Sequence, residues 1–381
     1  MSRLPHAHTE SPNRAYIPGI DQLRAGFALL VVFYHGLAEF SARLIHHSDF
    51  VFADWSHTRN PLLAVVVEGH TAVAGFMVLS GFIFVQGTLD RAVDYVAFLR
   101  NRVLRIYPLY LVLLTVAFCS VPGAFSWAGL AGMVLPLANF VPPPAIPLAA
   151  MGWTVAVEFQ FYLVFPLLLR LYQRHGTGLL LRLIVLAALL RLIAVALGAN
   201  AQWMSYWTIA GRIDQFLLGM LAGIRFARRG PERGGVPALA CAAAAVWALI
   251  YGFHLAGGWP LQAWWKALWP DAEGLAWAGF VLAFLPVGAR LPWALRRPVE
   301  AVGRISFSIY LLHFAVIQLL SEHGWILHPF ASATADALLT TLVVAVPAVL
   351  ALSAFTYTTI EAPFLALRGR YAGAAVAGPV R

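Results

Sequence analysis

Residues 179–197 read LLLRLIVLAALLRLIAVAL, an uninterrupted run that is apolar apart from two arginines. A helix needs about 20 mostly apolar residues to cross the hydrocarbon core of a membrane. This run therefore predicts a transmembrane helix, and nine similar segments accompany it. The ten predicted spans are Gln22–Phe40, Leu62–Val85, Ile106–Val121, Trp153–Leu171, Leu179–Leu197, Trp207–Phe226, Val236–Leu255, Gly274–Gly288, Ile305–Leu320 and Ala337–Ile360. The predicted fold is an all-α membrane bundle of about ten transmembrane helices.

The composition of the whole chain agrees with this fold class. Hydrophobic residues make up 61% of the chain, charged residues make up 11%, and the mean hydropathy is +0.76. An ordinary soluble protein carries roughly a quarter charged residues. So few charges cannot cover a water-exposed surface, and lipid must be the main solvent. We interpret the two cysteines, Cys119 and Cys241, as packed thiols, and the sequence has no Cys and His spacing typical of a metal site.

The basic residues predict the orientation of the bundle. The net charge is +9, and all basic residues except Lys266 are arginines. They punctuate the apolar segments instead of forming one patch, which argues against nucleic-acid binding and is typical of topology signals. If the N-terminus is cytoplasmic and the spans alternate, 20 of the 26 basic residues fall on the cytoplasmic side. We therefore expect both termini in the cytoplasm and a multi-pass protein of the cell inner membrane.

The sequence predicts no sizeable soluble domain beside the spans. We expect a polar N-terminal tail over residues 1–15, a transmembrane domain over 16–365 and a short cytoplasmic tail over 366–381. The first span contains Arg24 after a polar tail, so we predict an uncleaved anchor and not a signal peptide. The apolar stretch Trp127–Val141 runs into Pro142–Pro144, which favours a re-entrant or surface segment over an eleventh span.

The first span carries two ionisable residues that are candidates for function. Ionisable groups inside a bilayer are costly and are often functional. Arg24 and His35 are eleven residues apart, so they lie on one helix face about 16 Å apart along the axis. Arg24 is then near the cytoplasmic edge and His35 deep in the membrane. A histidine can take a proton from a hydroxyl near neutral pH. The alternative is a histidine that is hydrogen-bonded between helices.

A second basic group precedes the third predicted span. Arg102 and Arg105 are three residues apart and would share a face of a helix at the membrane surface. Guanidinium groups in a cluster suit phosphate oxygens because they can make bidentate contacts. The alternatives are a topology signal or a contact with lipid headgroups.

The other buried candidates favour structural roles. We interpret Glu158, Asp214 and Glu361 as structural acids, with Asp214 paired to a residue such as Arg191 and Glu361 paired to Arg24. His313 is a second intramembrane histidine, and such residues more often serve packing. The sequence contains no Gly-x-Ser-x-Gly nucleophile elbow, phosphate-binding loop or dinucleotide fingerprint. The simplest chemistry is direct attack by an acceptor hydroxyl, with a histidine as base.

Several segments together resemble the acyltransferase 3 family of bacterial integral-membrane acyltransferases. Each motif is short, but their order from residue 16 to about residue 365 is specific. One departure is Gln22, where the family usually has Gly. The segments are IDQLR at 20–24 leading to His35, VLSGF at 78–82, RVLRIYP at 102–108, WTVAVEFQFY at 153–162, ISFSIYLLH at 305–313 and TIEAP at 359–363.

The resemblance implies a ten-helix enzyme that takes an acyl group from acyl-CoA, most commonly acetyl-CoA, with no metal. The acceptor would be a hydroxyl of a surface or secreted glycan or of a glycosylated product. His35 and Arg24 match the essential pair of the first span, Arg102 and Arg105 match a segment linked to the donor, and Glu361 matches a last-span acid. The chain is expected to be a stand-alone member without an appended esterase-like domain.

These observations combine into one mechanistic hypothesis. The CoA phosphates bind the cytoplasmic arginines, the pantetheine arm passes between helices, and His35 accepts the proton of the attacking hydroxyl. General-base catalysis of this kind contributes roughly 10²–10⁴-fold. The main alternative is a transporter or exporter of a small acid or glycan precursor, which could also use buried Arg, His and Glu. A scaffold for polysaccharide assembly is a third possibility, although it would leave the shared face of Arg24 and His35 without a purpose.

Overall fold

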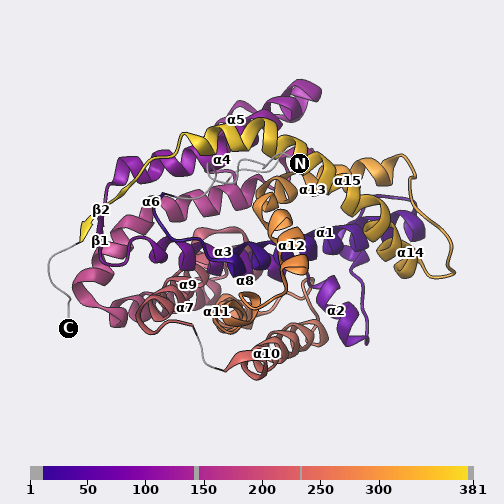
Figure 1. The fold of residues 1–381 in the computed structure, drawn as a ribbon. Coiled ribbons are helices and arrows are strands. Elements are labelled where there is room, and N and C mark those ends of the chain that lie inside the picture. The colour runs from indigo at the N-terminus through magenta and orange to yellow at the C-terminus, as the bar shows by residue number, and fades with distance from the viewer. Residues whose placement is uncertain (1–11, 141–145, 232–233, 376–381) are drawn as a thin grey trace.

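The computed structural model describes residues 12–140, 146–231 and 234–375. Most of the predicted N-terminal tail, Pro142–Pro144 of the proline run, and Arg3, Arg233 and Arg381 of the predicted cytoplasmic arginines lie outside the described residues. The described part is almost entirely helical (Figure 1). Its one sheet is a short antiparallel pair, in which β1 (Arg91–Val93) lies beside β2 (Ala372–Ala375).

The longer helices agree with the predicted spans to within a few residues at most ends. They are α1 (Pro18–His46), α3 (Thr71–Gln86), α4 (Tyr95–Ser120), α6 (Gly152–His175), α7 (Thr177–Ala196), α9 (Ile209–Arg229), α10 (Gly235–Leu255), α11 (Trp269–Gly288) and α13 (Ser306–Glu322). The last span is one continuous helix over Ala333–Ala366, made of α14 (Ala333–Thr340), a π-helical stretch (Thr341–Ala345), α15 (Val346–Thr356), a second π-helical stretch (Tyr357–Glu361) and α16 (Ala362–Ala366).

The remaining elements are short and join or flank these helices. They are the 3₁₀ turns Phe52–Asp54, Pro122–Ala124, Pro147–Ala149 and Trp264–Ala267, and the helices α2 (Pro61–Val67), α5 (Trp127–Val134), α8 (Ala201–Trp207) and α12 (Trp293–Arg304). At eight residues, α5 is too short to cross a membrane. That agrees with its interpretation as a surface or re-entrant segment.

Among the described residues, seven helices are long and apolar enough to cross a membrane, and two bent pairs raise the number to as many as nine. The pairs are α2 with α3 and α12 with α13, each bent by 69°. The predicted span Trp207–Phe226 corresponds to α9, which is long enough but carries Arg212 and Asp214 in addition to the arginines at its end. A multi-pass membrane fold is therefore supported, whereas the count of ten and the side of each terminus stay predictions.

The interior is built around α1 and α3. Helix α1 packs against α3, α12, α13 and α14, and α3 packs most closely against α9. The close approach of α3 and α9 depends on two glycines: a Cβ at Gly81 would lie 2.0 Å from the carbonyl oxygen of Phe216, and one at Gly219 would lie 2.0 Å from that of Val78. No side chain larger than hydrogen fits there, because such distances are far below van der Waals contact.

Two local predictions are wrong. The third span does not begin at Ile106, because its helix α4 begins at Tyr95 with Asp94 capping its N-terminus through a hydrogen bond from the Ala97 N–H. The arginines of residues 95–105 therefore stand on a helix. Cys119 and Cys241 are exposed and not packed inside the bundle. On a membrane protein an apolar exposed position is stable, since lipid and not water surrounds it.

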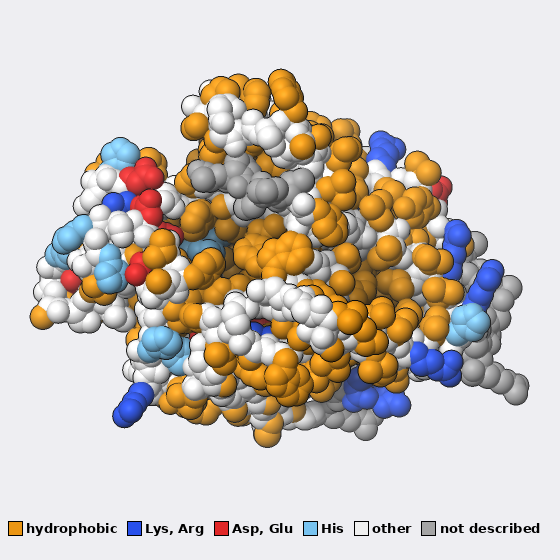
Figure 2. Space-filling model, turned by 180° about the vertical axis from the view of Figure 1, so that it is seen from behind, with side chains coloured by type: hydrophobic (Ala, Val, Ile, Leu, Met, Phe, Trp, Pro, Cys, Tyr) orange, Lys and Arg blue, Asp and Glu red, His pale blue; other side chains and the backbone are white. Residues whose placement is uncertain are grey.

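Apolar and charged side chains are distributed over the surface as in a membrane protein. Figure 2 shows a wide band of hydrophobic side chains, with most Lys and Arg side chains gathered at the end of the molecule that carries β1 and β2. Acidic and histidine side chains gather at the opposite end. An apolar band with basic residues at one end is the expected pattern for a protein that spans a bilayer.

Candidate active site

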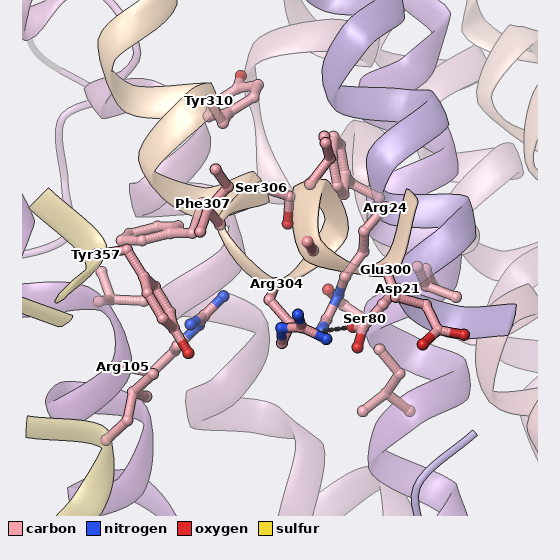
Figure 3. A pocket seen from close by; sticks show the side chains of 18 of the residues that line it. Asp21, Arg24, Ser80, Arg105, Glu300, Arg304, Ser306, Phe307, Tyr310 and Tyr357 are labelled. Atoms are coloured by element: carbon pink, nitrogen blue, oxygen red, sulfur yellow. Dashed lines mark hydrogen bonds and ion pairs between the residues drawn. The ribbon is translucent and has the colours of Figure 1, made fainter. Parts of the chain in front are cut away.

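A large cavity with a volume of about 1080 Å³ lies between the helices. It is lined by residues of α1, α3, α4, α6, α12, α13 and the C-terminal helix. Residues just before α1 (Arg14, Ala15 and Tyr16) and just after α16 (Arg368 and Tyr371) complete the lining. Its most unusual feature is the number of guanidinium groups, and Figure 3 shows three of them pointing into one space. The arginines that line the cavity are Arg14, Arg24, Arg102, Arg105, Arg296, Arg297, Arg304 and Arg368.

The arginines of this cavity repel one another. Burial lowers the pKa of Arg14 to about 10, and the positive charge of Arg24 adds to this effect. Burial likewise lowers the pKa of Arg368 to about 10, with Arg105 and Arg102 contributing. A guanidinium almost never loses its proton, so these shifts report mainly burial, with the positive charge of neighbouring arginines adding to it. An anion bound there would be stabilised.

Arg102 and Arg105 both line the cavity, so the prediction that they share a helix face is confirmed. Arg102 is held by aromatic rings: its guanidinium carbon lies 4.9 Å from the ring centre of Phe84 and 5.3 Å from that of Phe98. Cation–π contacts of this kind orient a guanidinium without using its N–H groups. The Nε of Arg102 is buried and has no hydrogen-bond partner in the described part of the chain.

Glu361 contacts Arg105 and not Arg24, so the predicted pairing with Arg24 is wrong. The Nη1 of Arg105 lies 3.1 Å from a carboxylate oxygen of Glu361, whose exposed fraction is 1%. The Ser308 hydroxyl donates to the other oxygen of this carboxylate. Glu361 lies at the end of the π-helical stretch Tyr357–Glu361. It is therefore in a position to orient Arg105 at the wall of the cavity.

Arg24 pairs with its own neighbour on α1. Its Nη1 lies 3.2 Å from a carboxylate oxygen of Asp21, three residues earlier on the same helix. Both residues line the cavity. Arg24 thus lies among the other arginines, as its predicted place near the basic end of the bundle requires.

His35 lies further along α1 and is not among the residues that line the cavity. Its half-buried ring lies between Tyr34 on its own helix and His313 and Phe314 on α13. The ring centres of His35 and His313 are 5.1 Å apart. The ring of His313 is in turn 5.7 Å from that of Tyr310, which lines the cavity. Tyr310 and His313 therefore form a chain of neighbouring rings that leads from the cavity to His35.

Glu158 is a cavity residue that sequence reasoning assigned to structure alone. Its carboxylate accepts hydrogen bonds from the hydroxyls of Ser80, at 3.1 Å, and of Tyr162. Glu158, Ser80 and Tyr162 all line the cavity. Glu158 and Ser80 lie within two of the short motifs quoted above, and that is the signal that could have found them.

Asp214, the third acid singled out in the sequence, belongs to a separate network of ion pairs. Asp214 pairs with Arg191 on α7, so the prediction that it pairs with another helix is confirmed. Arg191 also pairs with Asp271, at 2.6 Å, and Arg212 lies 3.6 Å from Glu273. These pairs join α7, α9 and α11 and take no part in lining the cavity. Within the described residues, no group of three or more His, Cys, Asp and Glu side chains is arranged so that it could hold a metal ion.

Comparisons with known proteins agree with the residue pattern. A family profile described as an acyltransferase domain, that of the acyltransferase 3 family, matches residues 17–357. A similar protein is Acyltransferase MdmB of Streptomyces mycarofaciens, which is 27% identical over 397 residues, covering 94% of each chain. No solved structure matches the chain. Because the profile covers nearly all of the helical bundle, this chain belongs to the acyltransferase 3 family and is a membrane acyltransferase.

Proposed function

We propose that this protein transfers an acetyl group from acetyl-CoA to a hydroxyl of a surface or secreted glycan or of a glycosylated product, in the cell inner membrane. The observation that carries this proposal is the arginine-lined cavity, because it fits the donor in both size and charge. The glycan acceptor and the inner-membrane location come from the family resemblance.

The donor is an elongated molecule with a diphosphate and a 3′-phosphate at one end and a thioester at the other. Arginine suits such a ligand because its planar N–H groups match phosphate oxygens. In the proposed complex the phosphates lie among Arg14, Arg102, Arg105 and Arg368. The mutual repulsion of these guanidinium groups is then relieved by the ligand. The apolar side chains of the cavity wall, such as Met77 and Phe76, would surround the pantetheine arm.

The acceptor hydroxyl needs a base when it attacks the thioester. His35 is the proposed base, because it is half-buried within the bundle and is linked through the ring of His313 to the cavity residue Tyr310. For the reaction to occur, the thioester must pass the rings of Tyr310 and His313. The contribution of the base to the rate is roughly 10²–10⁴-fold.

The test uses the protein purified into lipid nanodiscs, with radiolabelled acetyl-CoA as donor and a membrane and glycan extract from cells lacking the gene as acceptor. Wild-type protein should move the label into the extract without a membrane potential. His35→Ala should lower the rate by roughly 10²-fold or more. His46→Ala, on the same helix but with a side chain that is 46% exposed, should leave the rate unchanged. A transporter would leave acetyl-CoA intact, and full activity in the His35→Ala protein would overturn the role of His35.

A further inference from the structure

His313 is a completely buried polar side chain beside His35. It lies on α13, its exposed fraction is 0%, and its ring is tilted by 44° to that of His35 at a centre-to-centre distance of 5.1 Å. A buried polar side chain is normally hydrogen-bonded through all of its polar atoms. In His313, only one of the two ring nitrogens, Nδ1, meets this expectation.

The hydrogen bonds of His313 fix which nitrogen carries the proton. Its Nδ1 lies 2.8 Å from the carbonyl oxygen of Tyr310 and 3.1 Å from that of Ile309. A carbonyl oxygen can only accept a hydrogen bond, so Nδ1 must be the donor. In the neutral ring the proton is then on Nδ1, and Nε2 is left with a free lone pair.

The Nε2 of His313 has no hydrogen-bond partner among the described residues. A buried acceptor without a donor destabilises the fold by about 1–3 kcal/mol. Such a group persists in a native protein when a ligand, an ordered water or a functional state supplies the missing partner. The imidazole of His35, on the neighbouring helix α1, packs beside this ring with the two ring centres 5.1 Å apart, and a protonated imidazole carries a second N–H.

We propose that His313 is a positioning residue for His35. When the imidazole of His35 takes a proton it carries two N–H groups, and one of them donates to Nε2 of His313. The other nitrogen is thereby aimed at the reacting hydroxyl. Within the described chain His35 has no ion pair with a carboxylate, so a neutral imidazole takes the place that an aspartate has in the familiar Ser-His-Asp arrangement.

This inference rests on the proposed function, a transfer of the acetyl group from the thioester to the acceptor hydroxyl. The acceptor oxygen attacks the thioester carbonyl carbon while its proton moves to His35. The bond between that carbon and sulfur breaks, and the CoA thiolate leaves. His35 then gives its proton to the thiolate, so the products are the ester and free CoA. His313 stays neutral throughout, because its Nδ1–H remains bound to the helix carbonyls.

The experiment compares two amide substitutions that each keep one half of the imidazole. Asn at position 313 can place its NH₂ near the position of Nδ1, but it offers no acceptor at the position of Nε2. Gln can place its carbonyl oxygen near the position of Nε2. We expect His313→Asn to lower kcat by about 10- to 100-fold, the effect of losing a hydrogen bond to a charged group, with an unchanged KM for acetyl-CoA. His313→Gln should recover most of this loss.

Two controls separate this proposal from the proposed function and from simple packing. Thermal unfolding and gel filtration show whether each variant is folded, and ¹⁵N NMR of histidine-labelled wild-type protein reports the tautomer of His313 without any substrate. Equal losses in the Asn and Gln variants, a change in KM alone, or a proton on Nε2 in the spectrum would overturn the positioning role. If His313→Asn does not fold, the NMR spectrum of the wild type tests the proposal, because a proton on Nε2 of His313 would contradict it. If the wild type transfers no acetyl group, the proposed function fails while the tautomer remains measurable.

Discussion

The pair formed by Arg105 and Glu361 allows the donor site to be tested separately from the stability of the fold. The exposed fraction of the Arg105 side chain is 18%, and that of Glu361 is 1%. Arg105→Gln leaves a buried carboxylate without its cation, which costs about 3–5 kcal/mol of folding free energy. Adding Glu361→Gln replaces the ion pair by a neutral pair, and most of that loss should disappear, since neutral replacements of buried ion pairs are well tolerated.

The affinity for the donor should respond differently. A hydrogen bond between a guanidinium and a phosphate contributes about 1.5–3 kcal/mol, which corresponds to a roughly 10- to 150-fold change in Kd. We expect this weakening in both Arg105→Gln and the double variant. Isothermal titration calorimetry with acetyl-CoA, on protein in nanodiscs at low salt, measures the affinity, and thermal unfolding measures the stability.

Arg100→Gln is the matched control for this prediction. Arg100 stands on the same helix, but it is exposed and is not among the residues that line the cavity. Its replacement should change neither the affinity nor the unfolding temperature. A double variant that binds acetyl-CoA as tightly as the wild type would show that Arg105 serves the fold alone, and the donor would have to bind elsewhere in the cavity.

Two further predictions concern the packing of the bundle. Arg191→Met removes the buried partner of Asp214 and should lower the free energy of unfolding by about 3–5 kcal/mol; an unchanged thermal midpoint would mean that this carboxyl is neutral in the folded protein. Gly81→Ala should destabilise by at least about 1–3 kcal/mol because the new methyl group collides with the backbone at Phe216. Gly178→Ala, whose Cβ meets nothing within 4 Å, should have no such effect, and equal losses would contradict the close packing of α3 on α9.

Hydropathy predicted the helical content and most spans, because lipid-facing segments must be apolar over their whole length. It did not predict where spans bend. The break between α2 and α3 falls at 68–70, where Glu68 pairs with His70 and with His254 from α10. The contact with His254 joins residues far apart in the chain. A pattern read along the sequence therefore shows an apolar run where the fold has a 69° bend.

The cavity was predicted only in part, for a related reason. Arg24, Arg102 and Arg105 stood out through short motifs, whereas Arg304 and Arg368 were interpreted as topology signals. Both interpretations can hold at once, because a residue that favours the basic side of a membrane is also available to bind an anion there. Nothing local in the sequence separates an arginine that faces a cavity from one that faces water or lipid headgroups. That distinction requires the packing of α12 and the C-terminal helix around α1.

The place of Tyr310 connects the donor site with the proposed base. Its side chain lines the cavity, and its carbonyl oxygen accepts the hydrogen bond that fixes the tautomer of His313. A displacement of this turn of α13 when the donor enters would therefore act on the cavity and on the orientation of His313 together. Since His313 packs against His35, such a displacement would also reach the proposed base.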